Sequence, residues 1–136
     1  MREGTTLPRV PGDVTYLFPA IVVECLGRVA RGSGDPYLEL ADAAHDIAEH
    51  FRGDRLGVSD ARALLRGVDA AERMVWQRVP RLSPESAARG FGALKTAVAL
   101  WAVPFLEQCP ESLAGVGEDA SAFSSELYRL AEATVR

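Results

Sequence analysis

The residue types best suited to chemistry lie together between positions 45 and 50, in the order His-Asp-Ile-Ala-Glu-His. Imidazole and carboxylate groups are the usual ligands of zinc and related ions. On a helix, His45 and Glu49 share a face, as do Asp46 and His50, because residues four apart are neighbours. The two pairs point about 100° apart, however, and cannot easily share one ion. The chain has 2 His in all, so we favour solvated ion pairs and keep a metal site at His45, Glu49 and His50 as the weaker alternative.

The candidate nucleophiles carry no catalytic pattern. Cys25 and Cys109 lack the CxxC spacing of metal and redox sites and lie in apolar stretches, which predicts buried free thiols. The Gly-x-Ser-x-Gly motif of hydrolases is absent, and neither Gly-rich segment carries the Lys-Ser/Thr of a phosphate-binding loop. A dyad of Cys109 with a histidine would need adjacency in three dimensions. We therefore expect no catalytic residue and no cofactor, and lean toward a protein that is not an enzyme.

Opposite charges follow the outer sides of two predicted helices. The acidic face of the first consists of Glu39, Asp42, Asp46 and Glu49. The arginine face of the second consists of Arg62, Arg66 and Arg73, with Asp69 between them. Two solvated faces, or one hairpin whose rims attract, would explain the pattern, since each exposed ion pair contributes about 0 to 1 kcal/mol. Alternatively, the two faces bind a charged protein partner or close a symmetric homodimer, where charges steer association.

Trp76 lies three residues beyond Arg73, at the edge of the apolar side of its predicted helix. Trp and Arg are among the commonest hot spots of protein interfaces. We therefore choose Trp76 with Arg73 as the anchor of a partner-binding surface. A place in the core fits the sequence equally well.

Helix starts recur every 24 residues, at Asp35-Pro36, Ser59-Asp60 and Ser83-Pro84. Asp and Ser side chains accept hydrogen bonds from a first helical turn, and Pro fits there because its missing N–H has no partner. Apolar periodicity extends these starts into helices. The five predicted helices cover residues 13–30, 35–53, 59–79, 83–108 and 118–134. The expected fold is an all-α, single-domain bundle of about five helices, with short connections packing the second on the third and the third on the fourth.

Proline and glycine residues set the expected ends and turns. Pro19 is tolerated only in the first turn of the first helix, which begins between positions 13 and 18. Gly53 is expected to end the second helix as a left-handed cap. Pro104 should kink or break the fourth helix near Leu100. Residues 110–117 are expected to form a loop.

The predicted helix over 83–108 is apolar nearly all round, with Arg89, Lys95 and Thr96 as its only polar side chains between positions 86 and 107. Such a helix is normally surrounded by others, so we expect this fourth helix at the centre of the bundle. Gly90 and Gly92 would let a neighbouring backbone approach closely.

The small residues around the fourth helix could also leave a cavity for an apolar ligand. Its expected lining consists of Phe91, Leu94, Trp101 and Phe105. The same residues also suit an ordinary core.

Composition limits the remaining classes. A chain of 136 residues supports one core and is too short for two ordinary domains, so we expect an irregular arm over 1–12 and a bundle domain over 13–136. The formal net charge of -4 argues against nucleic acid as a partner. The longest apolar run, 97–106, is about half of a membrane-spanning length, so no membrane segment is expected. Free thiols favour the cytoplasm.

These observations predict a small acidic cytosolic protein that acts without catalysis. It would bind a protein partner or a second copy through its acidic and arginine faces, as an adaptor, an inhibitor or an immunity-type module. The alternative is a bundle that binds a small apolar ligand or a metal ion in its interior, with or without acting on the ligand.

Overall fold

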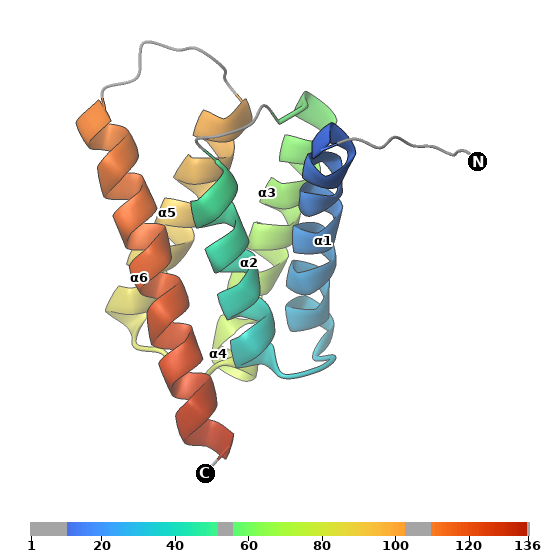
Figure 1. Cartoon of the computed structure of the whole chain (residues 1–136). Helices are drawn as coiled ribbons and strands as arrows, with labels where there is room; N and C mark the ends of the chain where they lie inside the picture. Colours follow the sequence, from blue (N-terminus) through green and yellow to red (C-terminus); the bar gives the residue numbers. More distant parts are fainter. Residues whose placement is uncertain (1–10, 52–55, 103–109, 136) are drawn as a thin grey trace.

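The structure is a computed structural model that describes the backbone of residues 11–51, 56–102 and 110–135 and the side-chain surroundings of 19–51, 56–102 and 115–133. These residues form six helices and no strand, which confirms the all-α prediction (Figure 1). The helices are α1 (Pro11–Arg31), α2 (Pro36–His50), α3 (Val58–Arg73), α4 (Val75–Arg78), α5 (Pro84–Ala102) and α6 (Pro110–Val135). Because α4 is a single turn, five long helices make the bundle.

The long helices form two layers (Figure 1). In the front layer α2 lies between α1 and α6, and in the rear layer α3 lies beside α5. α2 packs on α1, α6 and α5, and α3 packs on α5 as predicted. α3 also packs on α1, where the sequence predicted a hairpin with α2. The reason is that α1 and α6 already cover the sides of α2, so the chain crosses into the rear layer after His50.

Two of the three predicted helix caps are present. Asp35 Oδ1 accepts hydrogen bonds from the backbone N–H groups of Tyr37 (3.0 Å) and Leu38 (3.4 Å), and Ser83 Oγ accepts one from the N–H of Ser86 (3.1 Å). The prediction at Ser59 is wrong, because α3 begins one residue earlier and its N-cap is Gly57, which makes no side-chain bond. Gly57 has the extended backbone of a cap, with φ -68° and ψ 156°.

Several predicted boundaries are corrected. The helix expected over 59–79 breaks at Met74, whose φ of -100° and ψ of 4° leave the helical region. Residues 110–117 belong to α6 rather than to a loop, and Pro110 takes the first helical position, where Pro is compatible. α1 begins at Pro11 for the same reason, so Pro19 lies inside the helix and not in its first turn. The predictions at Gly53 and Pro104 lie outside the described residues.

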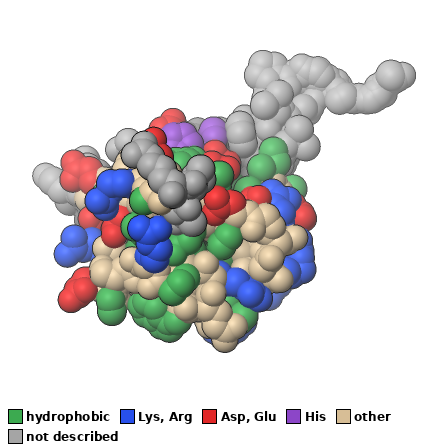
Figure 2. Space-filling view, turned by 90° about the horizontal axis from the view of Figure 1, so that it is seen from below, with side chains coloured by type: hydrophobic (Ala, Val, Ile, Leu, Met, Phe, Trp, Pro, Cys, Tyr) green, Lys and Arg blue, Asp and Glu red, His purple; other side chains and the backbone are tan. Residues whose placement is uncertain are grey.

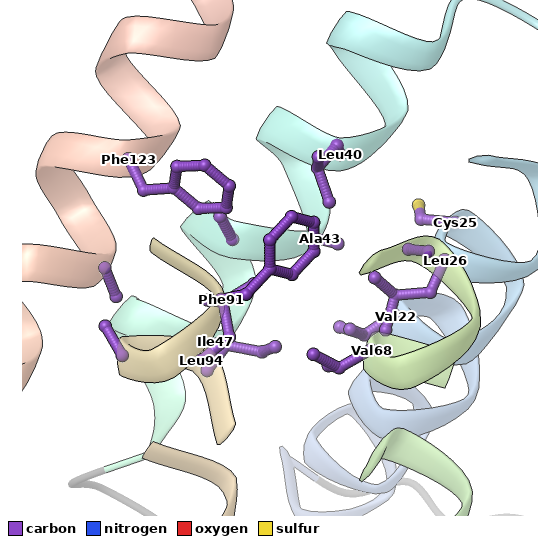
Figure 3. Packing of buried hydrophobic residues seen from close by; sticks show 14 of the residues in the cluster. Val22, Cys25, Leu26, Leu40, Ala43, Ile47, Val68, Phe91, Leu94 and Phe123 are labelled. Atoms are coloured by element: carbon purple, nitrogen blue, oxygen red, sulfur yellow. The ribbon is translucent and has the colours of Figure 1, made fainter. Parts of the chain in front are cut away.

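The core fills the space between the two layers (Figure 3). Its largest fully buried side chains are Val22, Leu26, Val29, Leu40, Ile47, Leu64, Val68, Val79, Leu82, Phe91, Leu94 and Leu127. The rings of Phe91 and Phe123 meet edge to face, with centroids 5.3 Å apart and planes at 65°. Three of the residues predicted to line a cavity, Phe91, Leu94 and Trp101, are thus buried parts of this core. The fourth, Phe105, lies outside the described residues.

α5 has a buried side and an exposed side. It packs on α2, α3 and α6. Its exposed positions include the small residues Ala88, Gly92, Thr96 and Ala99. Some of the residues that make this helix apolar nearly all round are therefore small side chains that face solvent. Its place at the centre of the bundle stays a prediction.

The two tryptophans test that prediction as a matched pair. Trp101 of α5 is 2% exposed, whereas Trp76 of α4 is 53% exposed. Trp101→Ala should lower the free energy of unfolding by about 3 to 5 kcal/mol, because it empties a large volume in the core. Trp76→Ala should change it by less than about 0.5 kcal/mol. Urea unfolding followed by circular dichroism measures both, and a loss below about 1 kcal/mol for Trp101→Ala would mean that the core lies elsewhere.

Gly90 and Gly92 of α5 form a second matched pair. A Cβ atom at Gly90 would lie 2.2 Å from Cδ1 of Phe123, whereas one at Gly92 would meet nothing within 4 Å. Gly90 thus accommodates an aromatic ring, where the sequence predicted a neighbouring backbone, and no close neighbour is found at Gly92. Gly90→Ala should destabilise the fold by about 1 to 3 kcal/mol through overpacking. Gly92→Ala should stabilise it by up to about 1 kcal/mol, because Ala favours the helix. Equal effects in a urea titration would contradict the seating of Phe123 on Gly90.

Candidate functional site

The acidic face runs along the outer side of α2, where α1 and α6 flank it. Its first residue, Glu39, is half-buried and already paired, since Arg28 Nε of α1 lies 3.0 Å from its Oε1 atom. Asp42 is exposed and accepts a short hydrogen bond from the hydroxyl of Tyr128 on α6. Two of the four carboxylates therefore have partners within the bundle.

The other half of the acidic face is less compensated. Asp46 is half-buried and Glu49 is exposed. Burial raises the pKa of the Asp46 carboxyl; the nearby His45 and His50 act against this rise, and the carboxylates of Asp42 and Glu49 add to it. Asp46 thus carries its charge at an energetic cost.

The structure does not assemble the weaker metal hypothesis into a ligand set. His45 is exposed on α2 and His50 is half-buried at the end of the same helix. Figure 2 shows the two histidines (purple) beside acidic side chains (red). Within 11–51, 56–102 and 110–135, no three His, Cys, Asp or Glu side chains are grouped so that they could hold a metal ion. His45, Glu49 and His50 are thus not brought together.

Cys25 lies on α1 behind the acidic face. It is buried and unpaired, as the sequence predicted, whereas Cys109 lies outside the described residues. Burial, followed by the negative charge of Glu39 and a hydrogen bond to it, raises the pKa of the Cys25 thiol to about 11, although Arg28 opposes this. A thiol with this pKa is almost fully protonated near neutral pH and is a poor nucleophile.

The arginine face covers the outer side of α3. Arg62, Arg66 and Arg73 are all exposed. The side chains that α3 buries, at Leu64, Val68 and Ala71 among others, point the opposite way. In the part of the chain that the structure describes, these three guanidinium groups make no hydrogen bond or ion pair.

Lys95 of α5 engages two acidic side chains of α3. Its ammonium group lies 3.5 Å from Oδ1 of Asp69 and 2.5 Å from Oε1 of Glu72. The described carboxylates nearest in sequence to Arg66 and Arg73 are thus paired with a cation of another helix. The sequence placed Asp69 between the arginines but contained no signal that a lysine of another helix engages it.

Trp76 lies just beyond the end of α3 that carries Arg73. The break at Met74 separates it from Arg73, and the indole is 53% exposed on α4. Of the two places that the sequence allowed for Trp76, the core and the surface, the structure has it on the surface.

The two charged faces do not form one surface. The acidic face belongs to the front layer and the arginine face to the rear layer (Figure 1). The face seen in Figure 2 mixes acidic and basic side chains and gathers neither into one patch. Sequence reasoning also missed the residues that modify each face, Arg28 and Tyr128 on the acidic side and Lys95 on the basic side.

Shallow surface grooves border α6. One is lined by Glu49, Glu118, Ser121 and Ser125, with small residues between them. Another is mainly apolar and lies where Leu38 of α2 meets Tyr128 and Ala131 of α6, with Arg129 and Glu132 at its rim. Both open to solvent and neither reaches the aromatic core residues.

Comparison with protein-family models, with curated proteins and with solved structures finds no match for this chain. Across the described helices, none is long and apolar enough to cross a membrane.

The raised pKa of Asp46 predicts a pH-dependent stability. Below the unfolded-state pKa, about 3.9, the carboxyl group is neutral in both states and costs nothing. As the pH rises through the higher folded-state value, the native protein acquires a charge that it disfavours and loses stability. Asp46→Asn should therefore be more stable than the wild type at pH 7, by less than about 1 kcal/mol because Asp46 is half exposed. The difference should vanish near pH 3.

Thermal unfolding of both proteins across this pH range measures the effect. Asp119→Asn, at an exposed position of α6, controls for the loss of one negative charge. A wild type that is more stable than Asp46→Asn at pH 7 would contradict the origin of the shift.

Proposed function

We propose that this chain is a non-catalytic binding protein whose arginine face, together with Trp76, docks an acidic protein surface. The observation that carries this proposal is a row of three exposed arginines for which the described residues supply no carboxylate partner, followed on α4 by an indole that is 53% exposed. Arg and Trp are enriched in interface hot spots, because both combine a large contact area with directed hydrogen bonds.

The fold itself gains little from the arginine face. Arg62 and Arg66 lie four residues apart, where like charges destabilise a helix by about 0.2 to 0.5 kcal/mol. Their planar guanidinium groups can each take a carboxylate in a bidentate geometry. An acidic partner would relieve the repulsion and steer its own approach to the rear layer.

The acidic face of α2 is the second candidate surface, for a basic partner. It is weaker because Arg28 already pairs with Glu39 and Tyr128 already binds Asp42. Asp46 and Glu49 remain as its available charges. The proposal places the protein in the cytoplasm, in keeping with the unpaired thiol of Cys25.

A fluorescent reporter built into the chain tests the arginine face. Trp101→Phe leaves Trp76 as the only tryptophan and removes a buried indole N–H for which the described residues supply no hydrogen-bond partner. A helical peptide that has glutamates on one face and leucines on the other should protect the fluorescence of Trp76 from quenching by acrylamide. The same peptide with lysines in place of the glutamates should not, because the arginines repel it.

Charge reversal supplies the control. Arg62→Glu, Arg66→Glu and Arg73→Glu together should abolish the protection. Arg89→Glu with Arg129→Glu, at exposed positions of α5 and α6, should preserve it. Equal protection by the acidic and basic peptides, or none by either, would overturn the proposal.

A further inference from the structure

The two layers of the bundle carry uncompensated charges of opposite sign. The arginine face of the rear layer makes no ion pair among the described residues, and the acidic face of the front layer retains Asp46 and Glu49. A second copy of this chain therefore presents a surface of the sign that each face needs. The opposite charges of the two faces therefore make a second copy of this chain a suitable partner.

The two faces also match in length. Arg62 and Arg73 are eleven residues apart on α3, and Glu39 and Glu49 are ten apart on α2, which is about 16 Å and about 15 Å along the helix axes. When α3 of one copy is laid antiparallel on α2 of another with Arg66 level with Asp46, Arg73 comes level with Glu39. In this register Arg62 falls within about 1.5 Å of the level of Glu49. Three arginines are then level with three carboxylates, of which Glu49 is exposed and Glu39 and Asp46 are half-buried.

Two like-charged pairs arise in this register, because Asp69 comes within about 1.5 Å of the level of Asp42, and Glu72 within about 1.5 Å of the level of Glu39. Within one copy Lys95 already engages Asp69 and Glu72. Within the other copy the hydroxyl of Tyr128 already binds Asp42. The repulsion in both pairs is therefore reduced before the two copies meet. Glu39 would share its charge between Arg28 of its own copy and Arg73 of the other.

The same register adds an apolar contact. Trp76 lies on the single turn α4 that follows α3, at the end of α3 that this register places over the Leu38 end of α2; Leu38 is 42% exposed. Leu38 borders the apolar groove between α2 and α6, together with Tyr128. An exposed indole thus faces one of the few exposed apolar side chains of the front layer.

From these observations we propose that the arginine face of one copy docks antiparallel on the acidic face of a second copy, so that chains associate head to tail. This inference rests on the proposed binding function and assigns its partner. Because the two faces lie on different layers, an assembly of docked copies keeps a free arginine face at one end and a free acidic face at the other. Such a contact is heterologous and extends with concentration, unlike the symmetric homodimer that the sequence suggested.

Native mass spectrometry and sedimentation velocity on the purified chain test this proposal. At about 0.01 M salt, where the screening length is about 30 Å, dimers and longer species should appear as the concentration rises. At about 1 M salt, where it is about 3 Å, they should dissociate. A wild type that stays monomeric at low salt up to its solubility limit would overturn the inference.

Charge-reversal variants test which surfaces meet. Asp42→Lys, Asp46→Lys and Glu49→Lys together should weaken association at least about tenfold, as should the triple Arg→Glu variant of α3. Each variant alone has two faces of one sign. Mixed together, they should associate again, because the first retains the native arginine face and the second the native acidic face. Association that survives either reversal, or a mixture that stays monomeric, would also overturn the inference.

Two controls complete the test. Arg89→Gln with Asp119→Asn, at exposed positions of α5 and α6 outside both charged faces, leaves the net charge unchanged and should associate like the wild type. Loss of association in this variant would overturn the assignment of the contact to the two charged faces. The peptide test separates the two proposals. Protection of Trp76 by the acidic peptide in a chain that never self-associates would refute the second copy as partner and leave the binding function standing.

Discussion

The enclosure of α2 is the constraint on which the rest of the structure depends. α1, α6 and α5 pack around this helix, and its side chains at Ala41, Ala43 and Ala44 are fully buried. Small side chains let the neighbouring helices approach closely, and the buried Ser124 hydroxyl of α6 donates a hydrogen bond to the Ala41 carbonyl (3.1 Å). Only a narrow outer strip remains for polar residues. Since an unpaired charge is costly to bury, the carboxylates of α2 must collect there, and the acidic face follows from the packing.

A single cation of α5 shapes the surface charge of the rear layer, to which α3 and α5 both belong. Lys95 binds Asp69 and Glu72 of α3, so these carboxylates do not neutralise the arginines beside them. Exposed ion pairs contribute little to stability, so this arrangement changes the surface more than it changes the fold. The segregation of charge is therefore a tertiary effect, made by two helices that meet and not by α3 alone.

The sequence correctly predicted those features that depend on residues close together in the chain. Asp35 and Ser83 cap helices as expected, and the three- and four-residue spacings place both charged faces outward. Predictions failed where distant residues decide. The segment 110–117 is helical although it contains two glycines, and Gly117 lies beside the ring of Phe51, from which a Cβ there would be only 3.5 Å away. No local signal marks the break at Met74 that leaves Trp76 exposed, or the layer to which each face belongs.

The rigidity of the helices determines how much a row of individually weak ion pairs can contribute to the free energy of association. Each exposed pair is worth at most about 1 kcal/mol, so one pair cannot hold two molecules together. Association costs several kcal/mol in lost motion, and flexible groups add to that cost when they become ordered. On α2 and α3 the spacing of the charges is already fixed by folding, so successive pairs can form without further ordering of the backbone. The proposed docking thus depends on the rigidity of the two layers as much as on their charge, and a cavity in the core would weaken it from a distance.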